Sequence, residues 1–222
     1  ITFTIVVVAS FAVLGYFGRE IYRQAPPVPD RVVTSDGRVL FTGADIRDGQ
    51  NVWQSTGGQE LGTVWGHGAY VAPDWSADWL HREAVEIGEQ WAQRDFGKGF
   101  DELDVEQKAA LEARLQGELR ANSYDPSSGD LVVSPDRAAA IAKVAQHYKS
   151  LYGDDPALAV LRDSYAMRTN TVDGVDRRDD LTAFFFWAAW ACVTERPGSD
   201  ITYSNNWPPD ALVGNRPTGA LI

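Results

Sequence analysis

The sequence predicts a mainly α-helical protein, in which one amino-terminal transmembrane helix precedes a helical domain with a small β-hairpin. Three observations lead to this prediction. The chain opens with an uncharged apolar run, several later segments repeat apolar residues at helical spacing, and two short β-branched runs flank a Ser-Asp-Gly turn. The chain has 222 residues, of which 44% are hydrophobic, so it can bury a sizeable core.

The apolar run over residues 1–17 contains no charge and is followed by Arg19, Glu20 and Arg23. A membrane-spanning helix needs about 20 apolar residues, so we expect a transmembrane helix over residues 1–23 whose first turn is missing. Because no small-residue cleavage site precedes Arg19, a retained anchor is favoured over a cleaved signal peptide. A buried core helix is the alternative.

The proline-rich residues 24–30 predict a stiff, extended linker between the membrane and the domain. The domain itself is expected over residues 31–216. Residues 217–222 end the sequence on Ala-Leu-Ile and resemble the start of a second transmembrane helix. The predicted organisation is therefore an anchor, a linker, one domain and a second membrane segment.

The domain opens with a predicted hairpin over residues 31–41, in which Val32 and Val33 precede the turn at residues 35–37. Capping residues then predict four helices, which begin near Asp74 or Ser76, at Asp104, at Ser134 and at Asp155. The apolar positions expected to face inward are Leu80, Ala84, Ile87, Trp91, Leu111, Leu115, Leu119, Ile141, Val144, Tyr148 and Leu151. A last helix over residues 178–193 is too short to span a bilayer, which predicts a buried or membrane-surface helix.

The composition excludes several classes of function. A net charge of −11 argues against a nucleic-acid partner, and a single cysteine, Cys192, excludes an intrachain disulfide and a cysteine-rich metal site. The three histidines, His67, His81 and His147, are scattered and have no metal-binding spacing. No phosphate-binding loop or nucleophile elbow occurs. The residues alone therefore indicate no active site.

Four stretches of the sequence resemble the amino-terminal part of the quinol-dependent nitric oxide reductases. They are residues 40–50, 53–83, 181–194 and 196–209. In this family the cytochrome subunit of the two-subunit enzymes is fused to the catalytic subunit and has lost its haem. Residues 96–176 resemble the family only loosely and have the character of an insertion-tolerant helical region.

The run from Gly57 to Pro73 resembles the haem-attachment region of the cytochrome subunit. A c-type haem needs a CxxCH motif, and its two cysteines and histidine would fall on Gly58, Leu61 and Gly62. None of these residues can bond a haem, and Met167, a conceivable axial ligand, then has no iron to bind. The resemblance therefore implies a cytochrome-c-like domain without haem.

The resemblance also implies a function. The family reduces nitric oxide to nitrous oxide with electrons from quinol. In its full-length members the catalytic residues, two b-type haems and a non-haem iron are held by membrane helices, so this fragment is expected to carry no catalytic residue and no haem. Carried over by residue, Gly68 and Tyr70 would be calcium ligands.

The expected partners are membrane lipid, quinol and the catalytic membrane bundle of the same chain, and the resemblance leaves room for a homodimer. The expected location is the bacterial cytoplasmic (inner) membrane, with the domain on the periplasmic side. A second reading is a stand-alone membrane-anchored partner-binding or assembly protein. Its binding face would consist of Trp53, Trp65, Trp75 and Trp79, although these tryptophans also suit a core.

Overall fold

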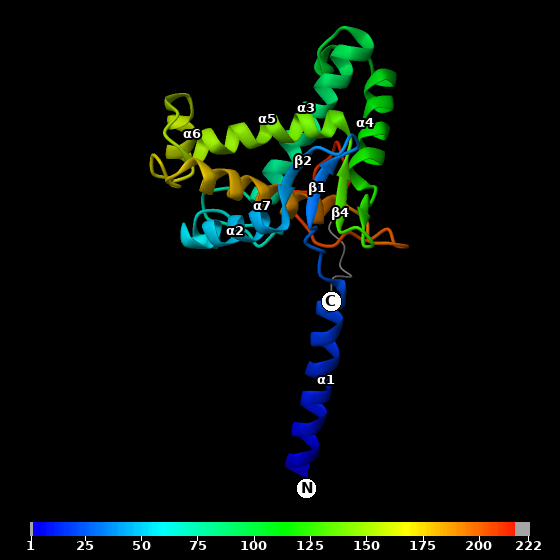
Figure 1. The fold of residues 1–222 in the computed structure, drawn as a ribbon, viewed down its shortest axis with the longest axis vertical. Coiled ribbons are helices and arrows are strands. Elements are labelled where there is room, and N and C mark those ends of the chain that lie inside the picture. Colours follow the sequence, from blue (N-terminus) through cyan, green and yellow to red (C-terminus); the bar gives the residue numbers. More distant parts are fainter. Residues whose placement is uncertain (1, 216–222) are drawn as a thin grey trace.

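The computed structural model describes residues 2–215 and shows one helix that projects from a mainly helical domain (Figure 1). This helix, α1 (Thr2–Gln24), has no buried residue. Its length and its mean hydropathy of 1.6 make it, among the described residues, the one helix long and apolar enough to cross a membrane. The structure therefore gives the predicted anchor the required shape. Residues 217–222, the predicted start of a second membrane segment, lie outside the described residues.

The chain between α1 and the domain, residues 25–30, forms neither helix nor strand, and it is hydrogen-bonded to the domain. The indole nitrogen of Trp187 donates a hydrogen bond to the carbonyl oxygen of Pro27, at 2.9 Å. Near the end of α1, the guanidinium of Arg196 donates to the side-chain oxygen of Gln24, at 2.7 Å. These hydrogen bonds hold the carboxyl-terminal end of α1, and the segment that follows it, against the domain.

The predicted hairpin is present as β1 (Arg31–Thr34) and β2 (Val39–Thr42), which pair in antiparallel fashion. It forms half of a four-stranded mixed sheet in the order β2-β1-β4-β3. The other strands, β3 (Tyr124–Asp125) and β4 (Asp130–Val133), were not predicted. Strand β4 runs parallel to β1, so the region 96–176 supplies a central strand of the sheet and is an integral part of the fold.

Helices make up most of the domain. They are α2 (Gly43–Ser55), α3 (Trp75–Phe96), α4 (Val105–Arg120), α5 (Pro135–Tyr152), α6 (Ala159–Ser164) and α7 (Val175–Val193), with short 3₁₀ turns at Gly58–Glu60, Phe100–Glu102 and Pro156–Leu158. The predicted helix starts are confirmed, because Asp74, Asp104 and Ser134 cap α3, α4 and α5 through their side-chain oxygens. Asp155 caps the 3₁₀ turn that leads into α6. The predicted inward-facing positions are also buried.

Helix α2 was not predicted. Its start carries a local signal, since Thr42 and Asp45 form a capping box. Its two glycines, Gly43 and Gly49, lower its helix propensity, so the sequence pattern did not predict a helix here. Packing requires one of them, Gly49. A Cβ atom at Gly49 would lie 1.9 Å from the carbonyl oxygen of Asp180, so only glycine allows α2 to lie this close to α7.

Helix α7 is the centre of the core. It packs against α2, α3 and α5, and every residue from Leu181 to Val193 is buried. The sequence left open whether this helix is buried or lies on the membrane surface, and the structure shows that it is buried. An aromatic core forms around it, because Phe184, Phe185 and Phe186 contact rings from the surrounding helices.

Candidate functional site

The glycine-rich loop of residues 57–73 joins α2 to α3 and contains the positions that the sequence aligned with a haem-attachment motif. Gly62, in the place of the haem-ligating histidine, has a φ of +129°. A Cβ atom built on it would lie 2.3 Å from the indole nitrogen of Trp75. Since real Cβ contacts are essentially never this short, the loop at Gly62 has no room for any side chain while Trp75 holds its place.

Trp75 is fully buried and occupies the space beside Gly62 as part of an aromatic cluster. Its ring centroid lies 5.7 Å from that of Phe185 in a stacked arrangement, and 5.6 Å from that of Tyr152. Tyr148 and Tyr165 complete its surroundings at 6.0 Å and 5.9 Å. Protein interiors are packed as densely as organic crystals, so the rings of this cluster leave no room beside Gly62 for a further side chain.

Asp74 fixes the loop to the start of α3. One carboxylate oxygen caps the helix by accepting from the backbone nitrogens of Ser76 and Ala77, at 3.0 Å and 3.4 Å. The other accepts from the backbone nitrogen of Gly66, at 2.7 Å, and from that of Trp207, at 2.9 Å. One buried carboxylate therefore holds together the glycine-rich loop, the helix and the segment around Trp207.

The predicted calcium ligands lie on the exposed part of this loop. Gly68 has a φ of +74°, which glycine adopts readily, and Tyr70 is fully exposed. Among the described residues, the Tyr70 hydroxyl has no hydrogen-bond partner. The two residues line an open hollow of about 660 Å³, together with Gln59, Glu60 and Ala69. The hollow therefore gathers oxygen donors from both ends of the loop.

A second hollow, of about 580 Å³, lies between the loop and the segment around Trp207. At its edge, the ring nitrogen Nδ1 of His81 lies 2.8 Å from a carboxylate oxygen of Asp210. The side chain of Asp210 is buried, whereas that of His81 is 61% exposed. This pair joins α3 to the carboxyl-terminal segment.

The three histidines do not converge. His67 contacts the carbonyl oxygen of Val64, at 2.9 Å, and His147 is half-buried on α5. Burial lowers the pKa of His147, and the nearby Arg82 lowers it further. Within residues 2–215 no group of three His, Cys, Asp or Glu side chains is placed to hold a metal ion.

Two polar clusters support the helices behind the loop. In the core, one carboxylate oxygen of Glu83 accepts from Arg137 at 2.7 Å, and the other accepts from the indole of Trp79 at 2.9 Å. Both charged side chains are almost completely buried. Because each carboxylate oxygen has a partner, the pair satisfies the condition under which a buried ion pair is tolerated.

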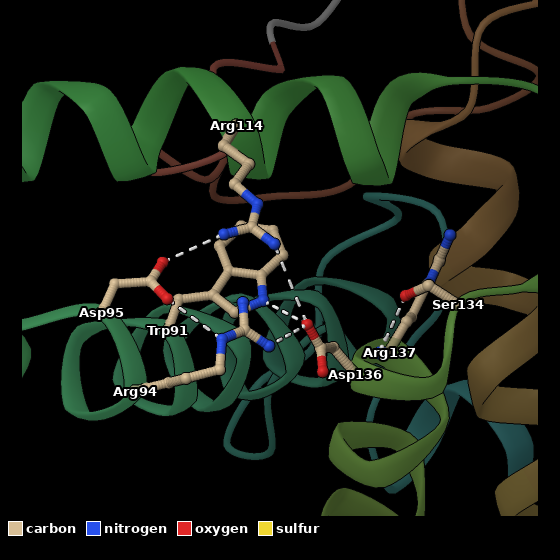
Figure 2. Close-up of polar contacts among 7 residues, drawn as sticks. All are labelled: Trp91, Arg94, Asp95, Arg114, Ser134, Asp136 and Arg137. Carbon is tan, nitrogen blue, oxygen red and sulfur yellow. Dashed lines mark hydrogen bonds and ion pairs between the residues drawn. The ribbon is translucent and has the colours of Figure 1, made fainter.

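The second cluster joins α3, α4 and α5 (Figure 2). Asp136 accepts from the indole of Trp91 at 2.6 Å and from Arg94 at 2.8 Å, and the guanidinium of Arg114 lies over the Trp91 ring at 3.9 Å. The hydrogen bonds from Arg94 and then from Trp91 hold the pKa of Asp136 below its usual value. Asp95, on α3, accepts hydrogen bonds from both Arg94 and Arg114 and so joins the two arginines.

The tryptophans of the alternative partner-binding reading are core residues. Trp53, Trp75 and Trp79 are buried, and Trp65 is half-buried with its indole bonded to the carbonyl oxygen of Ala188. Met167 is buried in the same core. These four tryptophans therefore do not form a binding face on the surface.

A comparison with protein families now identifies the fold. A family model described as the cytochrome c-like domain of the nitric oxide reductase NorB matches residues 29–209. The match covers most of the chain and includes the loop, the aromatic cluster and the Trp207 segment. The chain belongs to this family. A search of the curated proteins found no matching relative.

The family match also covers the region from Phe96 to Asp176, whose sequence resembles the nitric oxide reductase family only loosely. This agrees with the structure, in which β4 and α5 from that region build the sheet and the core of the cytochrome c-like domain. In this chain the domain has no CxxCH motif, because Cys192 is the single cysteine of the sequence. Cys192 is buried on α7, far in sequence from the loop, and its thiol donates to the carbonyl oxygen of Asn205.

Proposed function

We propose that this chain is the amino-terminal part of a membrane-bound nitric oxide reductase that reduces nitric oxide to nitrous oxide with quinol as the electron donor. The role of this part is structural. Helix α1 anchors it, and the cytochrome c-like domain caps a catalytic membrane bundle on the same chain. The observation that carries the proposal is the family match over residues 29–209, directly after a helix able to cross a membrane.

The domain is proposed to work without haem. Covalent haem attachment needs two thiols, and the aligned positions hold Gly58 and Leu61 instead. The place of the iron-ligating histidine is Gly62, where Trp75 leaves no room for a side chain. A quinol dissolves in the bilayer and delivers electrons there, so such an enzyme needs no electron carrier in its soluble domain. The two b-type haems and the non-haem iron of the full-length enzyme are proposed to lie outside this fragment.

Gly68 and Tyr70 are proposed to contribute to a calcium site at the junction between the domain and the bundle. The donor chemistry fits, since a backbone carbonyl, a phenol and the neighbouring Glu60 carboxylate are oxygen donors of the kind calcium accepts. The hydroxyl of Tyr70 is exposed, so it can meet a ligand from outside the domain. A bound calcium ion would neutralise nearby carboxylates and hold the two parts together. The other ligands would come from outside the fragment.

The proposed location is the bacterial cytoplasmic membrane, with the domain on the periplasmic side. Its proposed partners are membrane lipid, quinol and the catalytic bundle, and a homodimer is compatible with this arrangement. The net charge of −11 supports the absence of nucleic acid from this list.

The test uses the full-length native protein that carries this sequence. Its mass under denaturing conditions should lie far above 24.4 kDa, the mass of these 222 residues, with no covalently bound haem. A haem extract should contain only non-covalent b-type haem, and nitric oxide consumption should proceed with a reduced quinol analogue but not with reduced cytochrome c. A denatured mass near 24.4 kDa, or activity with cytochrome c alone, would contradict the proposal.

The calcium ligand is tested by Tyr70→Phe in the same protein. We expect the variant to lose calcium during desalting, as measured by elemental analysis, because the phenol oxygen no longer binds the ion. Tyr124→Phe is the control, since the Tyr124 hydroxyl also lacks a hydrogen-bond partner among the described residues but lies on β3, away from the loop. Equal calcium content in the wild type and Tyr70→Phe would remove Tyr70 from the site.

A further inference from the structure

A polar pocket of about 370 Å³ lies at one end of the domain and plays no part in the proposed function. The end of α2, the start of α7 and the loop after α6 form its walls, and Figure 1 shows these segments at the same end of the domain. Two arginines line it, Arg168 from the loop and Arg177 from α7, together with the apolar Leu61 and Ala166. The volume is within the range of small-ligand sites.

Neither of these two arginines forms an ion pair with a carboxylate among the described residues. They differ in this respect from the ion-paired arginines of the domain, which are Arg31, Arg82, Arg94, Arg114, Arg120 and Arg137. Other arginines of the domain, such as Arg47 and Arg162, also form no ion pair among the described residues, so the feature that Arg168 and Arg177 share is that their exposed side chains line the same pocket. Their N–H groups are available to a ligand.

The Arg177 side chain is held in place at the pocket. Its nitrogen Nη2 donates to the hydroxyl oxygen of Ser55, at 3.0 Å. The Ser55 hydroxyl in turn donates to the carbonyl oxygen of Val52, at 2.7 Å, within α2. This chain of hydrogen bonds uses one N–H group of the guanidinium, so the remaining N–H groups can point to a ligand.

One carboxylate, that of Asp173, also lines the pocket. It accepts a hydrogen bond from the side-chain amide of Asn170, whose oxygen accepts from Arg178 at 3.1 Å. The three charged groups that line the pocket, Arg168, Arg177 and Asp173, therefore sum to one positive charge. Asp173 weakens the attraction for an anion but does not cancel it.

We propose that this pocket binds an oxyanion of the phosphate type, carried either by free phosphate or by the headgroup of a phospholipid. The planar guanidinium presents N–H groups in a fork that matches the oxygens of a phosphate, and two such forks line this pocket. The proposal does not rest on the proposed function, because the residues of this pocket are separate from Gly68 and Tyr70.

The test titrates the full-length protein in detergent with inorganic phosphate, by calorimetry at constant ionic strength. Arg168→Gln and Arg177→Gln should each raise the dissociation constant for phosphate at least tenfold, whereas Asp173→Asn should lower it. Arg38→Gln is the matched control, because it removes the same charge from an exposed turn outside the pocket, and it should change the constant less than twofold. Unchanged melting temperatures establish that the variants are folded.

A second titration uses a short-chain phosphatidylglycerol below its micelle concentration. Saturation by phosphate, with the expected variant pattern, supports a free anion as the ligand. Saturation by the lipid alone, with the same pattern, supports a headgroup. The proposal is overturned if neither probe saturates, or if Arg38→Gln weakens binding as much as the pocket variants. Each of these outcomes leaves the nitric oxide assay unaffected, so the two proposals fail separately.

Discussion

The close approach of Gly62 to Trp75 gives a quantitative test of how the glycine-rich loop of residues 57–73 is packed. Replacing Gly62 with alanine introduces two costs. The φ of +129° is unfavourable for a residue with a side chain, which costs about 1–3 kcal/mol. The new Cβ atom also overlaps the buried indole of Trp75, and overpacking of this kind costs about 1–3 kcal/mol.

The sum, about 2–6 kcal/mol, is a large part of the stability of a typical domain. For a domain of this size, each kcal/mol lowers the melting temperature by about 2–4 °C. Gly58→Ala is the matched control, because Gly58 also has a positive φ, +54°, but its Cβ atom would meet nothing within 4 Å. We expect this control to lose about 1–2 kcal/mol, from the backbone alone.

The assay is thermal unfolding of the full-length protein, followed by tryptophan fluorescence. Both substitutions are then repeated in a Trp75→Phe background. The smaller ring removes the atoms that the new Cβ atom at position 62 would meet, so the cost of Gly62→Ala should fall by about 1 kcal/mol or more, whereas that of Gly58→Ala should not change. The reasoning is refuted if Gly62→Ala costs no more than Gly58→Ala and its cost is the same in both backgrounds.

Three further predictions concern the polar contacts behind the loop. Glu83→Gln should lower the free energy of unfolding by about 3–5 kcal/mol, because it leaves the buried Arg137 without its counter-charge, and Glu83→Leu combined with Arg137→Met should recover most of this loss in the same thermal assay. Asp136 has a lowered pKa in the folded state, so its stabilising contribution is present above its unfolded-state pKa and is lost as the pH falls through the folded value. Asp136→Asn should therefore lower the free energy of unfolding at pH 7 and make that free energy fall less steeply as the pH is lowered. An unchanged dependence of stability on acid pH would contradict this. Asp74→Ala should lower the free energy of unfolding by about 2–4 kcal/mol, because it removes a helix cap and leaves the backbone N–H groups of Gly66 and Trp207 without an acceptor. In hydrogen exchange, these two amides should then exchange faster, whereas the amides of α4 should not.

The sequence predicted those elements whose signals are local. The turn at residues 35–37 and the capping residues Asp74, Asp104 and Ser134 act within a few residues of themselves, and each defined its hairpin or helix correctly. Helix α2 was missed although Thr42 provides a local cap. Its glycines lower helix propensity, and the reason for Gly49 lies in α7, about 130 residues away.

Strand β4 was missed for a different reason. It pairs in parallel with β1 across about a hundred residues, as between Arg31 and Asp130, and nothing in either short strand identifies the other. Non-local pairing of this kind follows from the packing of the whole domain and not from the periodicity of one segment. The loosely matched region 96–176 therefore proved to be part of the core.

The sequence by itself determined that the chain carries an apolar amino-terminal segment, a series of capped helices and a loop without the thiols needed for haem attachment. These properties depend on residue identity and on spacing along the chain. Only the tertiary structure decided that Trp75 fills the space at Gly62, that Asp74 joins three segments, and that Arg168 and Arg177 share a pocket. The physical reason is that each of these arrangements depends on side chains or backbone groups that are distant in sequence and meet only when the helices pack around α7.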